Sequence, residues 1–249
     1  MAVLLGIFRE PPRPCSYLDE PPASLVHKRL LYVSPDEVDA MLERGWRRFG
    51  SDYFRPACSS CRECVSLRLP VDRFEPTRQQ RRVLRKGASL SVVVRPPVVD
   101  AERVALHQRW YAEREHSRGW DASSLDEADY AQQFAFPHPC AREVAYYDGP
   151  RLVGVGLCDE TPRAWSAAYF FYDPAYAAHS PGVLHVLTLV RLARERGQRH
   201  VYLGFRVAGC ASMRYKARFH PHELLTERPG ADETPGWQLV DGPAVTSRS

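Results

Sequence analysis

The chain has 249 residues, a hydrophobic content of 44%, a charged content of 26% and a formal net charge of +4. These values are typical of a globular protein with enough residues for one large domain or two smaller ones. No apolar run approaches the ~18 residues of a membrane-spanning helix, so the composition excludes a membrane-spanning protein.

The first signals along the chain concern cellular location and metal binding. The opening "MAVLLGIF" lacks a preceding basic region and is followed by "REPPRP" instead of a cleavage site, so we expect it to belong to the mature protein. Seven cysteines are an odd number, and three of them, Cys58, Cys61 and Cys64, crowd into "CSSCREC". This pattern predicts a reducing cytoplasm rather than a disulfide framework. Thiols at this spacing also suit a metal ion.

A basic helix is expected next, between Thr77 and Gly87. Thr77 and Gln80 have the spacing of a capping box, and Gly87 suits a left-handed stop. Arginines recur along the helix at i, i+3, i+4 and i+7, which places them on one face. Like charges on one face repel, so an anion such as phosphate would relieve the repulsion. A solvated basic face is the alternative. The expected phosphate-binding residues are Arg78, Arg81, Arg82, Arg85 and Lys86.

Two prolines predict a boundary between domains. Pro96 and Pro97 cannot both join a sheet ladder or a helix interior. We therefore expect an N-terminal domain over residues 1–96, with the cysteines and the basic helix, and a second domain over residues 97–240.

The second domain begins with helical and then strand patterns. Residues 100–120 have apolar side chains on one side and charged ones on the other, as in an amphipathic helix. Two β-rich runs then flank Asp148-Gly149, a hairpin signal. A third strand, "AWSAAYFFYDP", ends at Asp173 and Pro174.

A strand–helix–strand unit completes this domain. Ser180 and Pro181 suit a helix start and Gly197 its end, and "HVYLGF" follows as a strand. A strand, a helix and a strand joined by short connections form a parallel pair, so we expect an α/β (α+β) fold that is N-acetyltransferase-like (GNAT-like). That fold favours a coenzyme A acyltransferase. However, the loop "AAHSPGV" contains one glycine, and its proline lacks a donor, so pyrophosphate binding there is poorly supported.

Three segments together resemble the arginyl-tRNA–protein transferase family, and most closely its bacterial branch, the aspartate/glutamate leucyltransferases. They are "RPACSSCRECVSLRLPVDRFEPTRQQRRVLRKG", "AAYFFYDP" and "VYLGFRVAGCASMRYKARFHPHELL". The resemblance extends from about Cys15 to Leu225. It implies transfer of leucine or arginine from tRNA to the α-amine of proteins that begin with Asp or Glu, which creates a destabilising N-terminus for N-end rule degradation.

The resemblance also implies a metal site. Cys15 matches the family's fourth cysteine, beside Cys58, Cys61 and Cys64. Two-residue gaps with a remote fourth ligand resemble iron–sulfur ligation, whereas zinc more often binds two separated pairs. An iron–sulfur cluster, a four-thiolate zinc site and a set of structural thiols all remain open. No nucleotide cofactor is expected.

Tyr169 and Asp173 close the strand before the expected crossover helix, where ligands collect in open α/β sheets. There Tyr169 could donate to an oxyanion, and Asp173 could orient or deprotonate the amine. A core aromatic and a turn residue are the alternatives. Tyr215 belongs to the same expected catalytic set. The cations expected to bind the acceptor carboxylate or the tRNA end are Lys216 and Arg218, followed by Arg142 and Arg206. The basic helix would bind tRNA.

The sequence departs from the family pattern at two places. After Cys15 the usual basic, glycine-containing stretch is replaced by "DEPPASL", which leaves the transferred amino acid open, and Pro181 stands where leucine is usual. Two other functions also stay open, a coenzyme A acyltransferase and a non-catalytic, metal-containing RNA-binding protein. The expected partners are aminoacyl-tRNA and proteins with N-terminal Asp or Glu, with a monomer favoured and no membrane contact.

Overall fold

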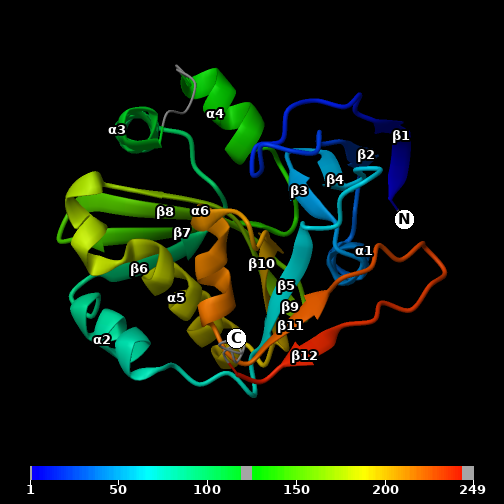
Figure 1. Ribbon diagram of the computed structural model, residues 1–249. Coiled ribbons are helices and arrows are strands. Elements are labelled where there is room, and N and C mark those ends of the chain that lie inside the picture. Colours follow the sequence, from blue (N-terminus) through cyan, green and yellow to red (C-terminus); the bar gives the residue numbers. More distant parts are fainter. Residues whose placement is uncertain (1, 119–124, 243–249) are drawn as a thin grey trace.

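The computed structural model describes residues 2–118 and 125–242, which form two β-sheets and the helices packed around them (Figure 1). The smaller sheet has four antiparallel strands in the order β1-β2-β4-β3. Their bounds are β1 (Val3–Arg9), β2 (Leu25–Leu31), β3 (Arg47–Phe49) and β4 (Asp52–Pro56). Helix α1 (Pro35–Glu43) begins with a capping box between Ser34 and Glu37.

The larger sheet has eight strands in the order β12-β11-β5-β10-β9-β8-β7-β6. Only β9 and β10 pair in parallel; the other pairs are antiparallel. Their bounds are β5 (Val65–Pro70), β6 (Ser91–Arg95), β7 (Ala141–Asp148), β8 (Arg151–Glu160), β9 (Ala164–Tyr172), β10 (His200–Arg206), β11 (His222–Leu225) and β12 (Gln238–Val240).

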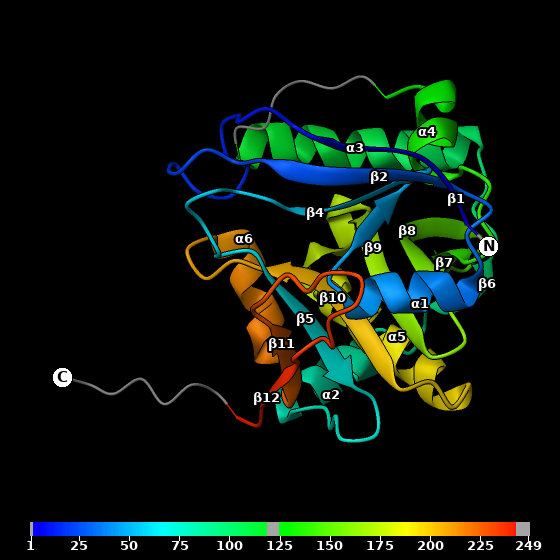
Figure 2. The ribbon, with the colours of Figure 1, turned by 90° about the vertical axis from the view of Figure 1, so that its right-hand side faces the viewer.

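Helices cover both faces of the larger sheet. The α-helices are α2 (Arg78–Lys86), α3 (Ala101–Arg118), α4 (Glu127–Phe134), α5 (Pro181–Glu195) and α6 (Ala211–Arg214), and short 3-10 turns are η1 (Pro174–His179) and η2 (Tyr215–Arg218). One core lies under α3, where Leu106 packs with Val155 and Phe171. A second core lies under α5, where Leu187 packs with Trp165. In Figure 2, α3 and the smaller sheet lie together at the top of the view, with α2 at the bottom.

A third core joins the two sheets. Val38 and Leu42 of α1 pack with Tyr53 of β4 and with Ala164 and Tyr202 of the larger sheet. Because buried apolar side chains from both sheets share this cluster, the smaller sheet and α1 pack against β9 and β10.

The expected mixed fold is confirmed at the level of a mixed α+β protein with sheets. The predicted hairpin is β7–β8, with Gly149 at a φ of +56° in its turn. The predicted crossover unit is β9, α5 and β10. The helix expected over residues 100–120 is α3, and residues 119 and 120 lie outside the described residues. In the described residues, no helix combines the length and apolar character needed to cross a membrane.

The larger sheet contains strands from both sides of the expected boundary at residue 96. Strands β5 and β6 lie within residues 1–96, yet β5 pairs with β10 and β11, and β6 pairs with β7. A cut at this position would divide one sheet. The division into domains 1–96 and 97–240 stays a prediction.

The basic helix has the predicted start but ends differently from the expectation. Thr77 and Gln80 form the capping box. Gly87 ends the helix with a φ of −88°, so the expected left-handed stop is wrong. Glycine suits this position for another reason, since a Cβ there would lie 2.5 Å from Leu184 Cδ2. The glycine therefore lets α2 pack closely against α5.

Candidate active site

A cavity opens where β9 and β10 separate. The two strands pair only from His200 to Tyr202, with Ala164 to Ser166 opposite. Beyond this point β9 continues alongside β8, while β10 continues alongside β5. Ligands in sheets of this kind collect at the carboxyl ends of parallel strands, where the chains diverge. Here the gap contains a cavity of about 200 Å³.

Three of the predicted site residues line this cavity together: Tyr169, Tyr215 and Lys216. They come from β9 and from η2, which follows β10. The smaller sheet supplies part of the wall through Arg47 of β3 and Phe54 of β4. The cavity is therefore built from both halves of the sequence.

Tyr169 and Tyr215 are neutral phenols in this environment. Burial raises the pKa of both side chains. The Tyr169 ring stacks on Phe134 at 5.0 Å between centroids, and its hydroxyl lies 3.5 Å from His107 Nε2. Burial lowers the pKa of His107 to about 4, so the imidazole is neutral at pH 7. Both tyrosines therefore keep a hydroxyl proton, and the recorded partner of the Tyr169 hydroxyl is His107.

Lys216 is buried without a carboxylate partner among the described residues. Its Nζ donates to the Phe205 carbonyl at 2.8 Å. Burial, and next the positive charge of Arg47, lower the pKa of Lys216 to about 7. Near pH 7 the Lys216 amine is therefore present in both its charged and its neutral form.

Arg47 is a cavity residue that sequence reasoning missed. Its Nη2 donates to the Ala167 carbonyl on β9. Gly204 on β10 makes room for the guanidinium: its φ is +76°, and a Cβ there would lie 3.1 Å from Arg47 Cζ. In the sequence Arg47 is one of two arginines in "GWRRFG", a pattern that resembles an ordinary surface strand, and no local signal distinguishes it.

A larger groove of about 840 Å³ meets the cavity at Tyr215, which lines both. Three arginines from different elements line the groove: Arg78 of α2, Arg206 of β10 and Arg218 of η2. The Nε atom of Arg206 is buried and has no partner among the described residues. Among the predicted acceptor-binding residues, Arg206 and Arg218 thus lie in the groove, whereas Lys216 lies in the cavity.

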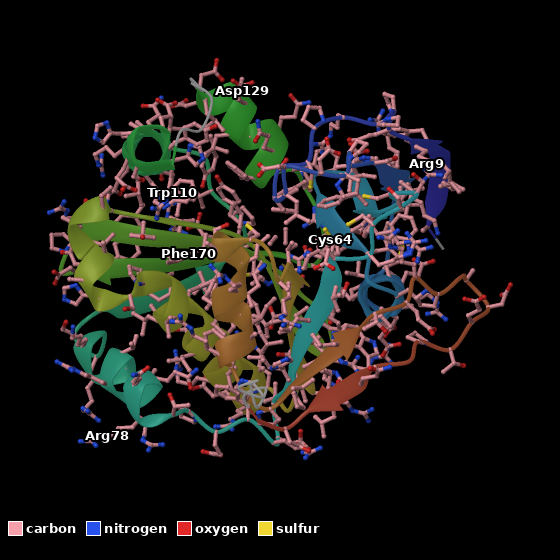
Figure 3. The ribbon with its side chains drawn as sticks, in the orientation of Figure 1. Arg9, Cys64, Arg78, Trp110, Asp129 and Phe170 are labelled. Atoms are coloured by element: carbon pink, nitrogen blue, oxygen red, sulfur yellow. The ribbon has the colours of Figure 1, made fainter. Side chains whose placement is uncertain are left out.

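The basic face of α2 adjoins this groove. Its members are exposed, and within residues 2–118 and 125–242 none of them forms an ion pair. The opposite face carries Val83 and Leu84, which pack against the core, and the buried Gln80. Figure 3 shows Arg78 at the outer edge of the molecule, on α2. The face comprises Arg78, Arg81, Arg82, Arg85 and Lys86.

Asp173 and Arg142 lie away from the cavity lining. Asp173 caps η1 by accepting from the Ala175 N–H at 3.0 Å, and it is paired with Arg151. Burial acts to raise the pKa of Asp173, but the Ala175 hydrogen bond and the Arg151 charge together hold it below its usual value. Arg142 pairs with Glu160 at 2.8 Å. The structure gives both side chains local partners.

The four predicted metal-binding cysteines lie near one another before β5. All are free and partly buried. Burial, followed by the charges of Cys15, Cys58 and Cys61, raises the pKa of Cys64 to about 12. In the described part of the chain, no three His, Cys, Asp or Glu side chains meet at metal-binding spacing.

Comparisons with known proteins identify the family. The family model described as the C terminus of arginine-tRNA-protein transferase matches residues 102–226, and the model of its N terminus matches residues 13–82. The aspartate/glutamate leucyltransferase of Helicobacter hepaticus is 32% identical over 92% of this chain and 95% of its own. That of Chromobacterium violaceum is 37% identical over 89% and 91%.

Among solved structures, the chain is similar to the C-terminal domain of a predicted lysylphosphatidylglycerol synthetase from Agrobacterium fabrum, with a TM-score of 0.48, 15% identity, and coverage of 83% of this chain and 64% of that one. It is also similar to FemX, with a TM-score of 0.42, 10% identity, and coverage of 68% and 59%. On the two family matches and the sequence relatives, the chain belongs to the arginine-tRNA–protein transferase family and is an aminoacyltransferase.

Proposed function

We propose that this protein transfers leucine or arginine from aminoacyl-tRNA to the N-terminal α-amine of proteins that begin with Asp or Glu. The observation that carries the proposal is that the arginine-lined groove and the cavity lie next to each other and share Tyr215 as a lining residue. The groove has the charge and size for the nucleotides of a tRNA end, and the cavity has the enclosure that the reacting ester needs. Residues 97–240 would then form the GNAT-like part of the enzyme.

The reaction is the aminolysis of an ester. The neutral α-amine attacks the aminoacyl carbonyl carbon, a C–N bond forms, and the bond from that carbon to the ribose oxygen breaks. The nitrogen loses one proton and the ribose oxygen gains one, so no nucleotide triphosphate is consumed. Because a free α-amine has a pKa of about 7.7–8.0, part of the acceptor is already nucleophilic near neutral pH. Positioning and charge stabilisation are the main demands on the protein.

Tyr169 and Tyr215 suit the stabilisation of the tetrahedral intermediate. Their raised pKa values keep both phenols protonated, and a protonated phenol donates to an oxyanion without giving up its proton first. Asp173 has a different environment, because Arg151 and the start of η1 occupy its carboxylate. We therefore assign Asp173 to holding the turn after β9 rather than to the amine.

The groove arginines and the basic face of α2 suit the tRNA backbone. Arg78 belongs to both surfaces, so phosphates bound along α2 continue into the groove beside Arg206 and Arg218. This places Arg218 on the side of the amino acid donor. Lys216 stays a candidate for the acceptor.

The cysteine cluster suits a thiolate-bound metal by its donor set, although within the described residues the thiols do not stand at metal-binding spacing. Cys15, Cys58, Cys61 and Cys64 are free and partly buried. Bound there, iron–sulfur or zinc would take the cysteines as thiolates, with release of their protons, and would tie the Cys15 segment to the start of β5. Aminolysis of an ester involves no change of oxidation state, so a metal at this site would have a structural role. In Figure 3, Cys64 lies near the top of β5.

A transfer assay tests the function. Purified protein is incubated with leucyl-tRNA or arginyl-tRNA and with peptides that begin with Asp, Glu or Ala, and mass spectrometry follows the peptide. The expected result is a mass increase of one leucine or arginine on the Asp and Glu peptides. Acetyl-coenzyme A, supplied instead of the charged tRNA, is the control donor and should give no product. A modified peptide with acetyl-coenzyme A alone would reject the proposal.

A cytoplasmic monomer is the proposed working form. Aminoacyl-tRNA is a cytoplasmic substrate, and all seven cysteines are free, as expected in a reducing compartment.

A further inference from the structure

Arg47 is a cation whose hydrogen-bonding capacity is only partly used. A guanidinium has five N–H donors. Its Nη2 donates to the Ala167 carbonyl, while Nη1 is buried and has no partner in the described residues. No ion pair joins Arg47 to a carboxylate in the part of the chain that the structure describes. Its neighbour Arg48, by contrast, is paired with Asp159.

The surrounding backbone holds Arg47 in place. The β9 strand contains an irregularity opposite Leu157 and Cys158, next to the Ala167 carbonyl that accepts from Arg47. On the other side, β10 has its own irregularity between Tyr202 and Gly204. Gly204 adopts a positive φ and has no Cβ that would press on the guanidinium. Two local departures from regular pairing therefore frame one arginine.

Lys216 brings a second cation to the same cavity. Both Arg47 and Lys216 line it, and no Asp or Glu is among its lining residues. The carboxylate that acts on Arg47, Asp159, is already paired with Arg48, so desolvation and repulsion of the two cations add to the free-energy cost of folding. Such an unfavourable arrangement is usually found at functional sites, because a bound ligand of opposite charge neutralises it. The missing partner is an anion.

The size of the cavity favours a small anionic group. At about 200 Å³ it is below the ~300–1,000 Å³ of pockets that take drug-sized ligands. The groove next to it is about four times larger and has its own arginines, so nucleotide phosphates have a better site there. The side-chain carboxylate of an acceptor's first residue fits the smaller space. Because this carboxylate lies close to the α-amine, the cation that binds it must also lie close to the reacting amine.

We propose that Arg47 and Lys216 together bind the side-chain carboxylate of the acceptor's N-terminal Asp or Glu. This inference rests on the proposed transfer reaction and adds the residue that selects its acceptor. The planar fork of Arg47 suits two carboxylate oxygens, and Lys216 adds a point charge. One of the two carboxylate-binding residues, Arg47, therefore belongs to β3 of the smaller sheet.

The test compares acidic and neutral acceptors on one variant. Arg47→Met keeps an unbranched, flexible side chain that replaces the apolar stem of the arginine, and it removes the charge. kcat/KM is measured with peptides beginning with Asp and with Asn, which differ only in the carboxylate. A charged hydrogen bond contributes enough that kcat/KM for the Asp peptide should fall roughly tenfold to a hundredfold. The Asn peptide should change little, so the Asp/Asn ratio should collapse.

Two further readouts separate recognition from folding. The affinity for charged tRNA should not change, and Tm should stay the same or rise, because the variant removes a buried charge that has no ion-paired carboxylate. Arg29→Met, on β2 of the same sheet, is the matched control: Arg29 is exposed and pairs with Asp52 at 2.9 Å. It should leave the Asp/Asn ratio unchanged. Should Arg47→Met not fold, Lys216→Met is measured in the same way.

Equal losses for the Asp and Asn peptides would overturn the inference and would assign Arg47 to the ester or the oxyanion. A weaker affinity for tRNA with an unchanged Asp/Asn ratio would overturn it in favour of phosphate binding. Wild-type protein that modifies Asp and Asn peptides equally also contradicts it, because nothing is then selected. Wild-type protein that modifies no peptide with either charged tRNA would instead reject the proposed function.

Discussion

Replacing Arg81, Arg82 and Arg85 with alanine removes three charges from the exposed side of α2. All three side chains face solvent, and in the described residues none of them is held by a carboxylate. Each is therefore available to a phosphate. The apolar face of the helix is untouched, so α2 should stay packed against α5.

The size of the effect follows from counterion release. Each neutralised phosphate contributes about 0.7–0.9 to the slope of log K against log salt concentration, so three contribute roughly 2–3. At 0.15 M salt the triple variant should bind tRNA roughly 50- to 170-fold more weakly, taking 1 M salt as the reference. Between 50 and 200 mM salt its affinity should fall roughly 20- to 40-fold less than that of the wild type.

Fluorescence anisotropy with labelled leucyl-tRNA at several salt concentrations measures the slope. The control variant carries the same charge change at three exposed, ion-paired arginines, Arg29, Arg163 and Arg191. It should keep the wild-type slope, because its positions lie outside the groove and the basic face. An unchanged slope in the α2 variant, or equal changes in both variants, would refute phosphate binding by α2.

Further predictions concern the metal, the groove, a buried ion pair and a lysine. Cys61→Ser should lose the iron or zinc of anaerobically purified protein together with some thermal stability; active wild-type protein containing neither metal contradicts this. Arg218→Ala should raise the Kd for tRNA and leave the KM for the peptide unchanged, and the opposite pattern would place it at the acceptor. Glu143→Ala leaves Arg103, which is 1% exposed, without its bidentate partner, and should lower the free energy of unfolding in urea by about 3–5 kcal/mol. An Arg103→Met/Glu143→Leu double variant should be more stable than the single variant, and equal instability would argue against an unpaired buried charge as the cause. In the folded state Lys216 has a pKa of about 7, below the ordinary 10.5 of lysine, so between these values the folded state binds fewer protons than the unfolded state. The contribution of Lys216 to stability therefore rises with pH across that window. The unfolding free energy of the wild type minus that of Lys216→Met should therefore increase from pH 7 to pH 10, and a constant difference would refute the shift.

The elements that the sequence predicted well are those with local signals. The capping box of Thr77 and Gln80, the Asp148-Gly149 turn and Pro181 at the first position of α5 each fix a helix end or a turn within a few residues. Family resemblance then supplied the site residues, of which Tyr169, Tyr215 and Lys216 do line one cavity.

The features that sequence reasoning missed depend on contacts between distant residues. Nothing near "GWRRFG" indicates that Arg47 reaches the gap between β9 and β10, because that gap forms from residues more than a hundred positions later. Ser180 also differs from expectation: it precedes α5 with a φ of 54° and makes no side-chain cap. In the same way, the run "VSLRLP" predicts a strand but not its partners. This strand, β5, pairs with β10 and β11, which lie more than a hundred residues later in the sequence.

The position of β5 has a consequence for how the chain is made. During synthesis β5 emerges well before β10 and β11, the two strands between which it lies. Until they appear, both of its edges have unpaired backbone groups, and its apolar residues Leu67 and Leu69 have no core to enter. Such a strand is a template for association with other chains. A fragment ending near residue 96 should therefore aggregate, and the nascent protein depends on its last quarter, or on a chaperone, to keep β5 from pairing with another copy.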